Sequence, residues 1–169
     1  GETCPNCGKK TLTVTETIRE IPYFGKTSLY SMRCQNEYCD FFEADVESLE
    51  NRGPMKVSLL VKSERDVNTR VVKASSATVI LGDIGSIESS EKSSGYITTI
   101  EGVLNRMQQQ IEGVKRRAED EETMETAKKH LQTIEEVIGG TKQLQVTIVD
   151  KKGNSMIIHE DAVVTKLDE

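Results

Sequence analysis

All four cysteines of the chain lie in two short stretches near its beginning, and their spacing is that of a metal site. Two residues separate Cys4 from Cys7, four separate Cys34 from Cys39, and 26 residues lie between the two pairs. Two closely spaced cysteine pairs joined by a strand-rich segment are the ligand pattern of a zinc ribbon. Gly8, directly after Cys7, suits a tight turn that needs a left-handed residue. We therefore expect Cys4, Cys7, Cys34 and Cys39 to bind one zinc ion.

Other chemistries of these cysteines fit less well, with one exception. A thioredoxin-like redox motif at Cys4 and Cys7 would be followed by a βαβ unit, which the sequence does not predict. Two disulfides would need an oxidising compartment, which nothing in the sequence indicates. Iron held as in rubredoxin uses the same ligands and stays open on chemistry alone. Four thiolates complete a tetrahedron without His130 or His159, so the site is expected to be structural rather than catalytic.

The composition of the chain disfavours several classes of partner. Of its 169 residues 36% are hydrophobic and 30% are charged, which is typical of a globular protein. The net charge is −6, and the first fifty residues carry five Lys or Arg against nine Asp or Glu. Nonspecific nucleic-acid binding depends on basic residues, so it is not expected. There is no signal-like start and no apolar run long enough for a membrane helix, so we expect a cytoplasmic protein without a membrane partner.

Alternating apolar and polar residues predict most of the strands. Between the cysteine pairs, "TLTVTETIRE" and "TSLYSMRC" have this pattern, separated by a turn at Pro22 to Gly25. Gly25-Lys26-Thr27 is not a phosphate-binding loop, because the glycine that such a loop needs five residues earlier is Glu20. Strands are also predicted at "KVSLLVKS" and within "TRVVKASSATVILGDIG". "QLQVTIV" and "SMIIH", around a turn at 150–154, are predicted to form a β-hairpin.

A change of period after residue 98 predicts two amphipathic helices. Their apolar residues step by three and four and are Ile100, Leu104, Met107, Ile111 and Val114, then Met124, Ala127, Leu131, Ile134 and Ile138. Thr98 is expected to cap the first helix, with Glu101 closing a capping box. Gly139 and Gly140 end the second helix. A charged turn joins the two helices into an antiparallel hairpin.

These elements predict a mainly β protein with some α-helix. Residues 1–50 are expected to form the zinc ribbon, and residues 54–169 a β-rich domain with the helical hairpin at about 98–139. Because strands lie on both sides of the hairpin in the sequence, the second domain is expected to be a double-stranded β-helix or sandwich-like fold with the hairpin inserted.

Three stretches, "CPNCG", "IPYFGKTSLYSMRC" and "GYITTIEGVL", in this order, resemble the ZPR-type zinc-finger family. The resemblance covers nearly the whole chain and implies a single-copy, archaeal-like member, with Cys4, Cys7, Cys34 and Cys39 as zinc ligands. It also implies a protein that binds translation elongation factor one alpha and assists its folding. The four residues between Cys34 and Cys39 depart from the family, which commonly has two there.

The expected function is therefore binding rather than catalysis, since no nucleophile elbow, dinucleotide loop or HExxH motif occurs. The candidate partner-binding residues are Tyr23, Phe24, Thr98, Thr99 and Glu101, of which Tyr23 and Phe24 are expected to be exposed at the turn. Two alternatives are a nucleic-acid-binding ribbon in transcription or translation initiation, and a scaffold for another protein partner.

Overall fold

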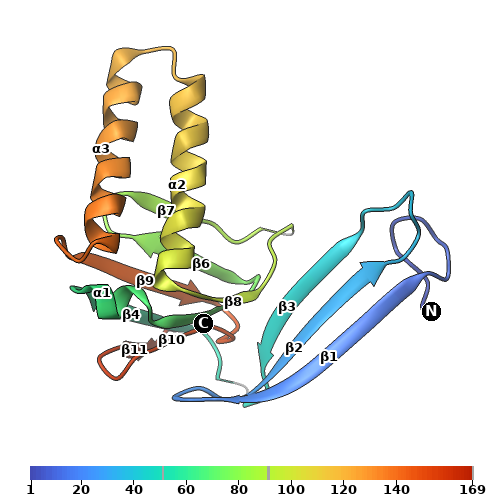
Figure 1. Cartoon of the computed structure of the whole chain (residues 1–169). Coiled ribbons are helices and arrows are strands. Elements are labelled where there is room, and N and C mark those ends of the chain that lie inside the picture. Colours follow the sequence, from blue (N-terminus) through green and yellow to red (C-terminus); the bar gives the residue numbers. More distant parts are fainter. Residues whose placement is uncertain (51, 91, 169) are drawn as a thin grey trace.

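The computed structural model describes residues 1–50, 52–90 and 92–168. A long three-stranded sheet carries the cysteines at its outer end, and beside it lies a body of two further sheets from which two helices project (Figure 1). We call residues 1–50 the ribbon and residues 52–168 the β body. The architecture confirms the predicted fold class. No helix in the described parts of the chain is long and apolar enough to span a membrane. The domain limits 1–50 and 54–169 stay a prediction.

The ribbon contains one strand more than the sequence analysis predicted. Its strands are β1 (Leu12–Ile21), β2 (Gly25–Cys34) and β3 (Phe42–Ser48), in the order β1-β2-β3 and all antiparallel. The third strand was missed, although its alternation of Phe42, Ala44 and Val46 with three acidic residues was the available signal. Lys26 and Thr27 lie within β2 and not before a helix, which agrees with the rejection of a phosphate loop.

The turn between β1 and β2 separates two aromatic residues that were expected to behave alike. Tyr23 has a φ of 64°, the one left-handed non-glycine residue among those described, and is 63% exposed. Phe24 is 1% exposed and belongs to the main hydrophobic core. The expected exposure of Phe24 was therefore wrong. The left-handed residue reverses the chain, so neighbouring side chains leave the turn on opposite sides, and the apolar Phe24 is the one that packs inward.

The β body is built from antiparallel strands in two sheets, together with one short helix. One sheet has the order β11-β4-β9-β6-β7 and the other β10-β5-β8. The elements are β4 (Met55–Val61), α1 (Glu64–Val67), β5 (Arg70–Lys73), β6 (Ala77–Leu81), β7 (Gly85–Ile87), β8 (Tyr96–Thr99), β9 (Leu144–Asp150), β10 (Met156–Ile158) and β11 (Val163–Lys166). The two sheets and the helices share one hydrophobic core.

The hairpin predicted between residues 143 and 159 does not form. β9 pairs with β4 and β6, whereas β10 pairs with β5 in the other sheet. The buried Asp150 carboxylate redirects the chain, because it accepts hydrogen bonds from the Asn154 amide (3.0 Å) and the Ser155 hydroxyl (2.6 Å). Ser155 Oγ also accepts from the Ala74 amide at 2.9 Å, which brings the chain beside β5. The alternation of apolar and polar residues in the sequence gives no indication of these hydrogen bonds to a buried carboxylate.

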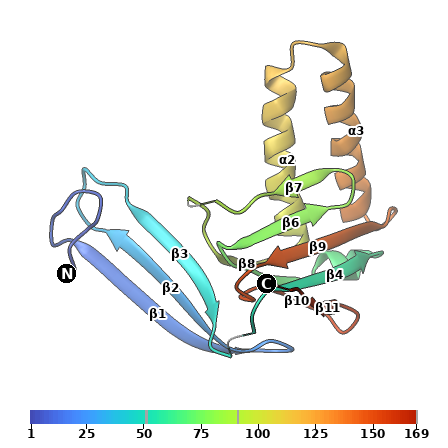
Figure 2. The same cartoon turned by 180° about the vertical axis from the view of Figure 1, so that it is seen from behind.

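The helical hairpin consists of α2 (Ile100–Arg117) and α3 (Glu121–Ile138), inserted between β8 and β9. The two helices lie side by side, and their inner ends pack on the β body while their outer ends stand clear of it (Figures 1 and 2). Val114, expected on the packed stripe, is accordingly 44% exposed. The helix cap differs by one residue from the prediction: Thr99 Oγ1, not Thr98, accepts from the Gly102 amide at 3.1 Å. Thr98 is the register partner of Val71 within a sheet.

Candidate metal centre

The fold brings the four cysteines together. One ligand atom from each of Cys4, Cys7, Cys34 and Cys39 lies within 4.8 Å of the others. Cys4 Sγ is 3.9 Å from Cys39 Sγ, and Cys7 Sγ is 3.7 Å from Cys34 Sγ. These separations exclude disulfides, whose sulfurs are about 2.05 Å apart. They match the edge of a tetrahedron with zinc–sulfur bonds of about 2.3 Å, which is about 3.8 Å.

Two chain turns place the sulfurs. The first runs through the Cys4–Cys7 pair, where the Gly8 amide donates to the Cys4 carbonyl at 2.9 Å. Gly8 has a φ of 71°, as the sequence analysis expected for this position. The second turn is larger and is closed by the Cys39 amide, which donates to the Asn36 carbonyl at 2.9 Å. Strand β2 ends at Cys34, so the sheet itself carries the third sulfur to the pair at the beginning of the chain.

Hydrogen bonds favour the thiolate form at two of the cysteines. A backbone amide at Lys9 lowers the pKa of Cys7 to about 6. The Thr11 hydroxyl, 3.1 Å from Cys34 Sγ, is the largest cause of the lowered pKa of Cys34. Burial raises the pKa of Cys4, against the opposing effect of the amides of Cys7 and Asn6. Metal ligands must be deprotonated, so these amides and this hydroxyl prepare the site for a cation.

The donor set fits zinc. Four thiolates in a closed tetrahedral arrangement are the ligands of structural zinc sites, and soft sulfur ligands also accept iron. Cys4 and Cys34 are buried with Leu12, and Met32 and Phe41 pack against them. This apolar shell covers Cys4 and Cys34, whereas Cys7 and Cys39 are half-buried. Four thiolates complete a tetrahedron and leave no free ligand position for a substrate.

Two residues near the sulfurs were missed by the sequence analysis. Besides Thr11, the Asn6 side-chain amide donates to Cys39 Sγ at 3.3 Å. Asn6 lies within the first cysteine pair, so its position was a signal that could have been used. Thr11 lies seven residues from Cys4 along the chain and reaches Cys34 only because β1 and β2 pair, so no local motif indicated its role.

The other candidate residues do not form one site with the cysteines. Tyr23 lies at the opposite end of the ribbon, and Thr98, Thr99 and Glu101 lie at the junction of β8 and α2. Thr99 has a structural role as the helix cap, and Glu101 is in the first turn of the helix. Their role in binding a partner stays a prediction.

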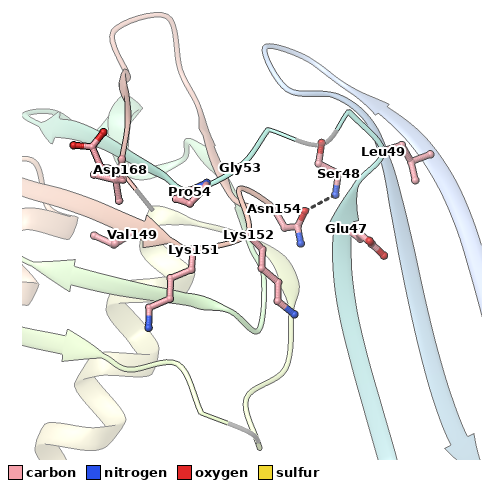
Figure 3. A pocket seen from close by; sticks show the side chains of 11 residues that line it. Glu47, Ser48, Leu49, Gly53, Pro54, Val149, Lys151, Lys152, Asn154 and Asp168 are labelled. Atoms are coloured by element: carbon pink, nitrogen blue, oxygen red, sulfur yellow. Dashed lines mark hydrogen bonds between the residues drawn. The ribbon is translucent and has the colours of Figure 1, made fainter.

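A cavity of about 1000 Å³ separates the inner end of the ribbon from the β body (Figure 3). Ser48 and Leu49 line it on the ribbon side, and Lys151, Lys152 and Asn154 on the other. The Ser48 amide donates to Asn154 Oδ1 at 2.9 Å across this cavity. The two lysines are exposed, so the cavity is an open space at the junction rather than a built binding site.

Fold and site together define a class: a ribbon of the zinc-finger type, with a four-cysteine centre, followed by a two-sheet β body with an inserted helical hairpin. Residues 65–167 match the family model of the ZPR1 jelly-roll domain. An uncharacterised ZPR1-like protein of Methanocaldococcus jannaschii is 37% identical over 159 residues, which cover 93% of this chain and 79% of that protein. The chain therefore belongs to the ZPR1 family, as the resemblance in the sequence implied.

Two further relatives show the breadth of the family. A ZPR1-like protein of Pyrococcus horikoshii is 37% identical, and the match covers 97% of this chain and 75% of that protein. The zinc finger chaperone zpr1 of Schizosaccharomyces pombe is 28% identical over 91% of this chain, but the match covers only 33% of that longer protein.

Proposed function

We propose that this chain is a zinc-binding, non-catalytic interaction protein of the cytoplasm. It binds translation elongation factor one alpha and acts as a folding or assembly chaperone for it. The observation that carries this proposal is membership of a family in which one relative is named a zinc finger chaperone. The closed four-cysteine centre supports it, because a site without a free ligand position suits a structural role.

In this proposal the metal stabilises the ribbon. Cys4, Cys7, Cys34 and Cys39 would hold zinc, whose bonds to four thiolates supply folding free energy to an element with a small core. At the cysteine end of the ribbon that core contains only Leu12 with two of the cysteines, packed against a few half-buried neighbours. The ribbon can then display its surface as a rigid sheet.

Tyr23 is the candidate contact that the structure favours most among the residues named from the sequence. Its side chain is 63% exposed at the turn, and its left-handed backbone is unfavourable for a residue with a Cβ atom. Tyrosines are among the residues that most often contribute a large part of the binding free energy at protein interfaces. A strained and exposed aromatic residue is consistent with selection for binding rather than for stability.

A Tyr23→Gly variant separates these two effects. Glycine adopts a positive φ freely, so we expect the free energy of unfolding to rise by up to about 1 kcal/mol. Loss of the aromatic ring should weaken binding to elongation factor one alpha about tenfold. Urea unfolding and titration calorimetry measure the two quantities. Tyr38→Gly, at a tyrosine that is 85% exposed beside the cysteines, is the control. Unchanged binding by Tyr23→Gly would remove Tyr23 from the proposed interface.

The function itself is tested with purified elongation factor one alpha from the source organism. We expect the zinc-loaded chain to bind the factor in solution and to raise the yield of active factor after dilution from denaturant. The chain stripped of zinc by a chelator should do neither. Metal analysis of the protein purified under reducing conditions distinguishes zinc from iron. Absence of binding, with and without GTP, would contradict the proposal.

A further inference from the structure

The sheet of the ribbon has two faces of different character. Residues opposite each other on paired strands share a face, and successive residues alternate between faces. Val14 lies opposite Met32, and Ile18 lies opposite Ser28. They belong to what we call the outer face, formed by the even-numbered residues of β1 and β2 from Val14 to Met32 and by the odd-numbered residues of β3.

The other face of the sheet is turned toward the β body. Thr15, Thr17 and Val46 on this face line a cavity of about 420 Å³ together with Tyr96 and Ile97 of β8. Val46 is buried and belongs to the main core. On the outer face, Asp45 and Tyr30 also reach this cavity, because the β body contacts the edge strand β3. The part of the outer face on β1, with Val14 and Ile18, does not line it and points away from the β body.

Apolar side chains on the outer face are exposed. Val14 is 51% exposed and Ile18 is 53% exposed, and the half-buried Met32 and Tyr30 lie beside them on β2. Met32 also packs against the cysteine cluster, so this apolar stripe continues into the metal centre. On β1 the exposed Glu16 lies between Val14 and Ile18, and the half-buried Tyr30 and Met32 connect the two across β2. Apolar side chains gathered in solvent on one face of a sheet are a candidate surface for a partner.

Acidic residues surround the stripe. Glu16 and Glu20 of β1 and Glu43 and Glu47 of β3 are exposed on the outer face, and Lys26 is the basic residue at these positions. The first fifty residues account for −4 of the net charge of −6. After burial, the main causes of the raised pKa of Tyr30 are the charges of acidic residues on β3. The face therefore has a negative potential over an apolar centre.

The ribbon holds this face in a fixed orientation. Asp45 on β3 accepts from the Ser75 amide at 2.8 Å and also from the Ser75 hydroxyl. The Gly95 amide donates to the Ala44 carbonyl at 2.8 Å. These contacts join the ribbon to the β body at a second place, far along the sheet from the turn. A surface that is rigid before binding loses less conformational entropy on association.

We propose that the outer face of the ribbon is the docking surface for the protein partner, and that it recognises a positively charged protein surface with apolar side chains at its centre. The proposal rests on the proposed function and names the part of the molecule that makes the contact. The occupant follows from charge complementarity: lysines and arginines of the partner face the glutamates, and its apolar side chains cover Val14 and Ile18. The negative potential disfavours a nucleic acid as occupant.

The charge arm of the test uses the full chain with zinc bound and purified elongation factor one alpha. The triple variant Glu16→Gln, Glu43→Gln, Glu47→Gln should associate with the factor about tenfold more slowly than wild type at low salt, because electrostatic steering is removed. Its association rate should also depend less on salt. The matched control neutralises three exposed acids of the helical hairpin region, Glu119, Glu122 and Glu135, and should change the rate less than about twofold.

The apolar arm uses Ile18→Ser, which should raise the dissociation rate about tenfold because the centre of an interface carries most of its binding energy. Leu60→Ser, at a 41% exposed residue of the β body, is its control. Zinc content and thermal melting establish that each variant is folded. Binding that survives both the triple variant and Ile18→Ser, or that is weakened equally by the controls, overturns the docking surface alone. A wild-type chain that does not bind the factor overturns the proposed function itself.

Discussion

At the scale of single residues, the metal centre depends on groups that act on the sulfurs as well as on the sulfurs themselves. The Thr11 hydroxyl and the Asn6 amide each donate to or contact a different cysteine, Cys34 at 3.1 Å and Cys39 at 3.3 Å. Such outer contacts orient metal ligands and tune the charge on them. The metal centre therefore depends on Asn6 and Thr11, which precede β1 in the chain, as well as on the spacing of the cysteines.

Replacing one ligand should remove the metal. In a Cys34→Ser variant we expect loss of most of the bound zinc and unfolding of the ribbon, because structural zinc binding and folding are coupled. Zinc per chain by mass spectrometry and amide dispersion in NMR spectra measure these effects. Ser31→Ala, on the same strand, is the control and should keep its zinc. One full equivalent of zinc in Cys34→Ser would contradict the ligand assignment.

The buried position of Lys73 makes the stability of the protein depend on pH. It is 2% exposed, and none of the ion pairs found in the described parts of the chain involves it. Burial lowers the pKa of Lys73, although Asp45 and Asp150 oppose this effect. The folded state therefore binds this proton less tightly than the unfolded state does. The free energy of unfolding therefore increases as the pH rises from the folded-state pKa of Lys73 to the ordinary value of about 10.4.

A Lys73→Met variant should thus be more stable than wild type at pH 7. We expect a gain of the order of 1 kcal/mol, since methionine fills the space without a buried charge. The gain should shrink as the pH rises above the lowered folded-state pKa, because the wild-type protein gains stability there and the variant has no amine to titrate. Part of it is offset by loss of the contact between the Lys73 ammonium and the Tyr96 ring, 5.7 Å apart. Urea unfolding at pH 7 and pH 9.5 tests both points, and a clearly less stable variant at pH 7 would refute them.

At the scale of elements, the junction of β8 and α2 is where a strand of the β body becomes a projecting helix. Residues Thr98 and Thr99 have similar side chains and adjacent positions, but the structure gives them different roles. Both residues pair with β5, Thr98 with Val71 and Thr99 with Arg70. Only Thr99, the last residue of β8, also accepts from the Gly102 amide and caps the helix. The propensity of threonine for a helix cap does not choose between two neighbouring threonines; the end of the strand pairing does.

This difference gives a matched pair of substitutions. Thr99→Ala should lower the free energy of unfolding by about 1 kcal/mol, because the Gly102 amide loses its acceptor. Thr98→Ala should have an effect within about 0.5 kcal/mol. Thermal and urea unfolding of the two variants measure the difference. If Thr98→Ala is the more destabilising, the cap assignment is wrong.

At the scale of the whole molecule, the relation between ribbon and β body depends on a close approach at Gly95. A Cβ atom added there would lie 2.1 Å from Asp45 Oδ1 and 2.8 Å from the Val46 amide. These atoms belong to the contact that fixes β3 against the β body. The ribbon's cysteine end otherwise extends away from the body, so this contact determines how firmly the ribbon is held (Figures 1 and 2).

A Gly95→Ala variant should therefore loosen the ribbon without emptying the metal centre. We expect a loss of about 1 to 3 kcal/mol in stability from overpacking, with zinc content unchanged. Relaxation of backbone amides by NMR should show faster independent motion of the ribbon. Ser94→Ala, at the preceding residue, should leave the motion as in wild type. Equal relaxation in wild type and Gly95→Ala would show that this contact does not hold the ribbon.

The sequence by itself determined the features that depend on residue type and local period. Cysteine spacing, the left-handed Gly8, most strands and both helices follow from short-range chemistry that neighbouring residues display directly. The family follows from the same local motifs.

Only the tertiary structure decided the features that depend on which distant residues meet. It placed Phe24 in the core and Tyr23 in solvent, sent β10 to a different sheet from β9, and brought Thr11 to Cys34. It also turned one face of the ribbon toward the β body and left the acidic, apolar face open. Pairing partners and buried polar contacts are set by competition among all surfaces of the chain for burial, and a local pattern does not record the outcome of that competition.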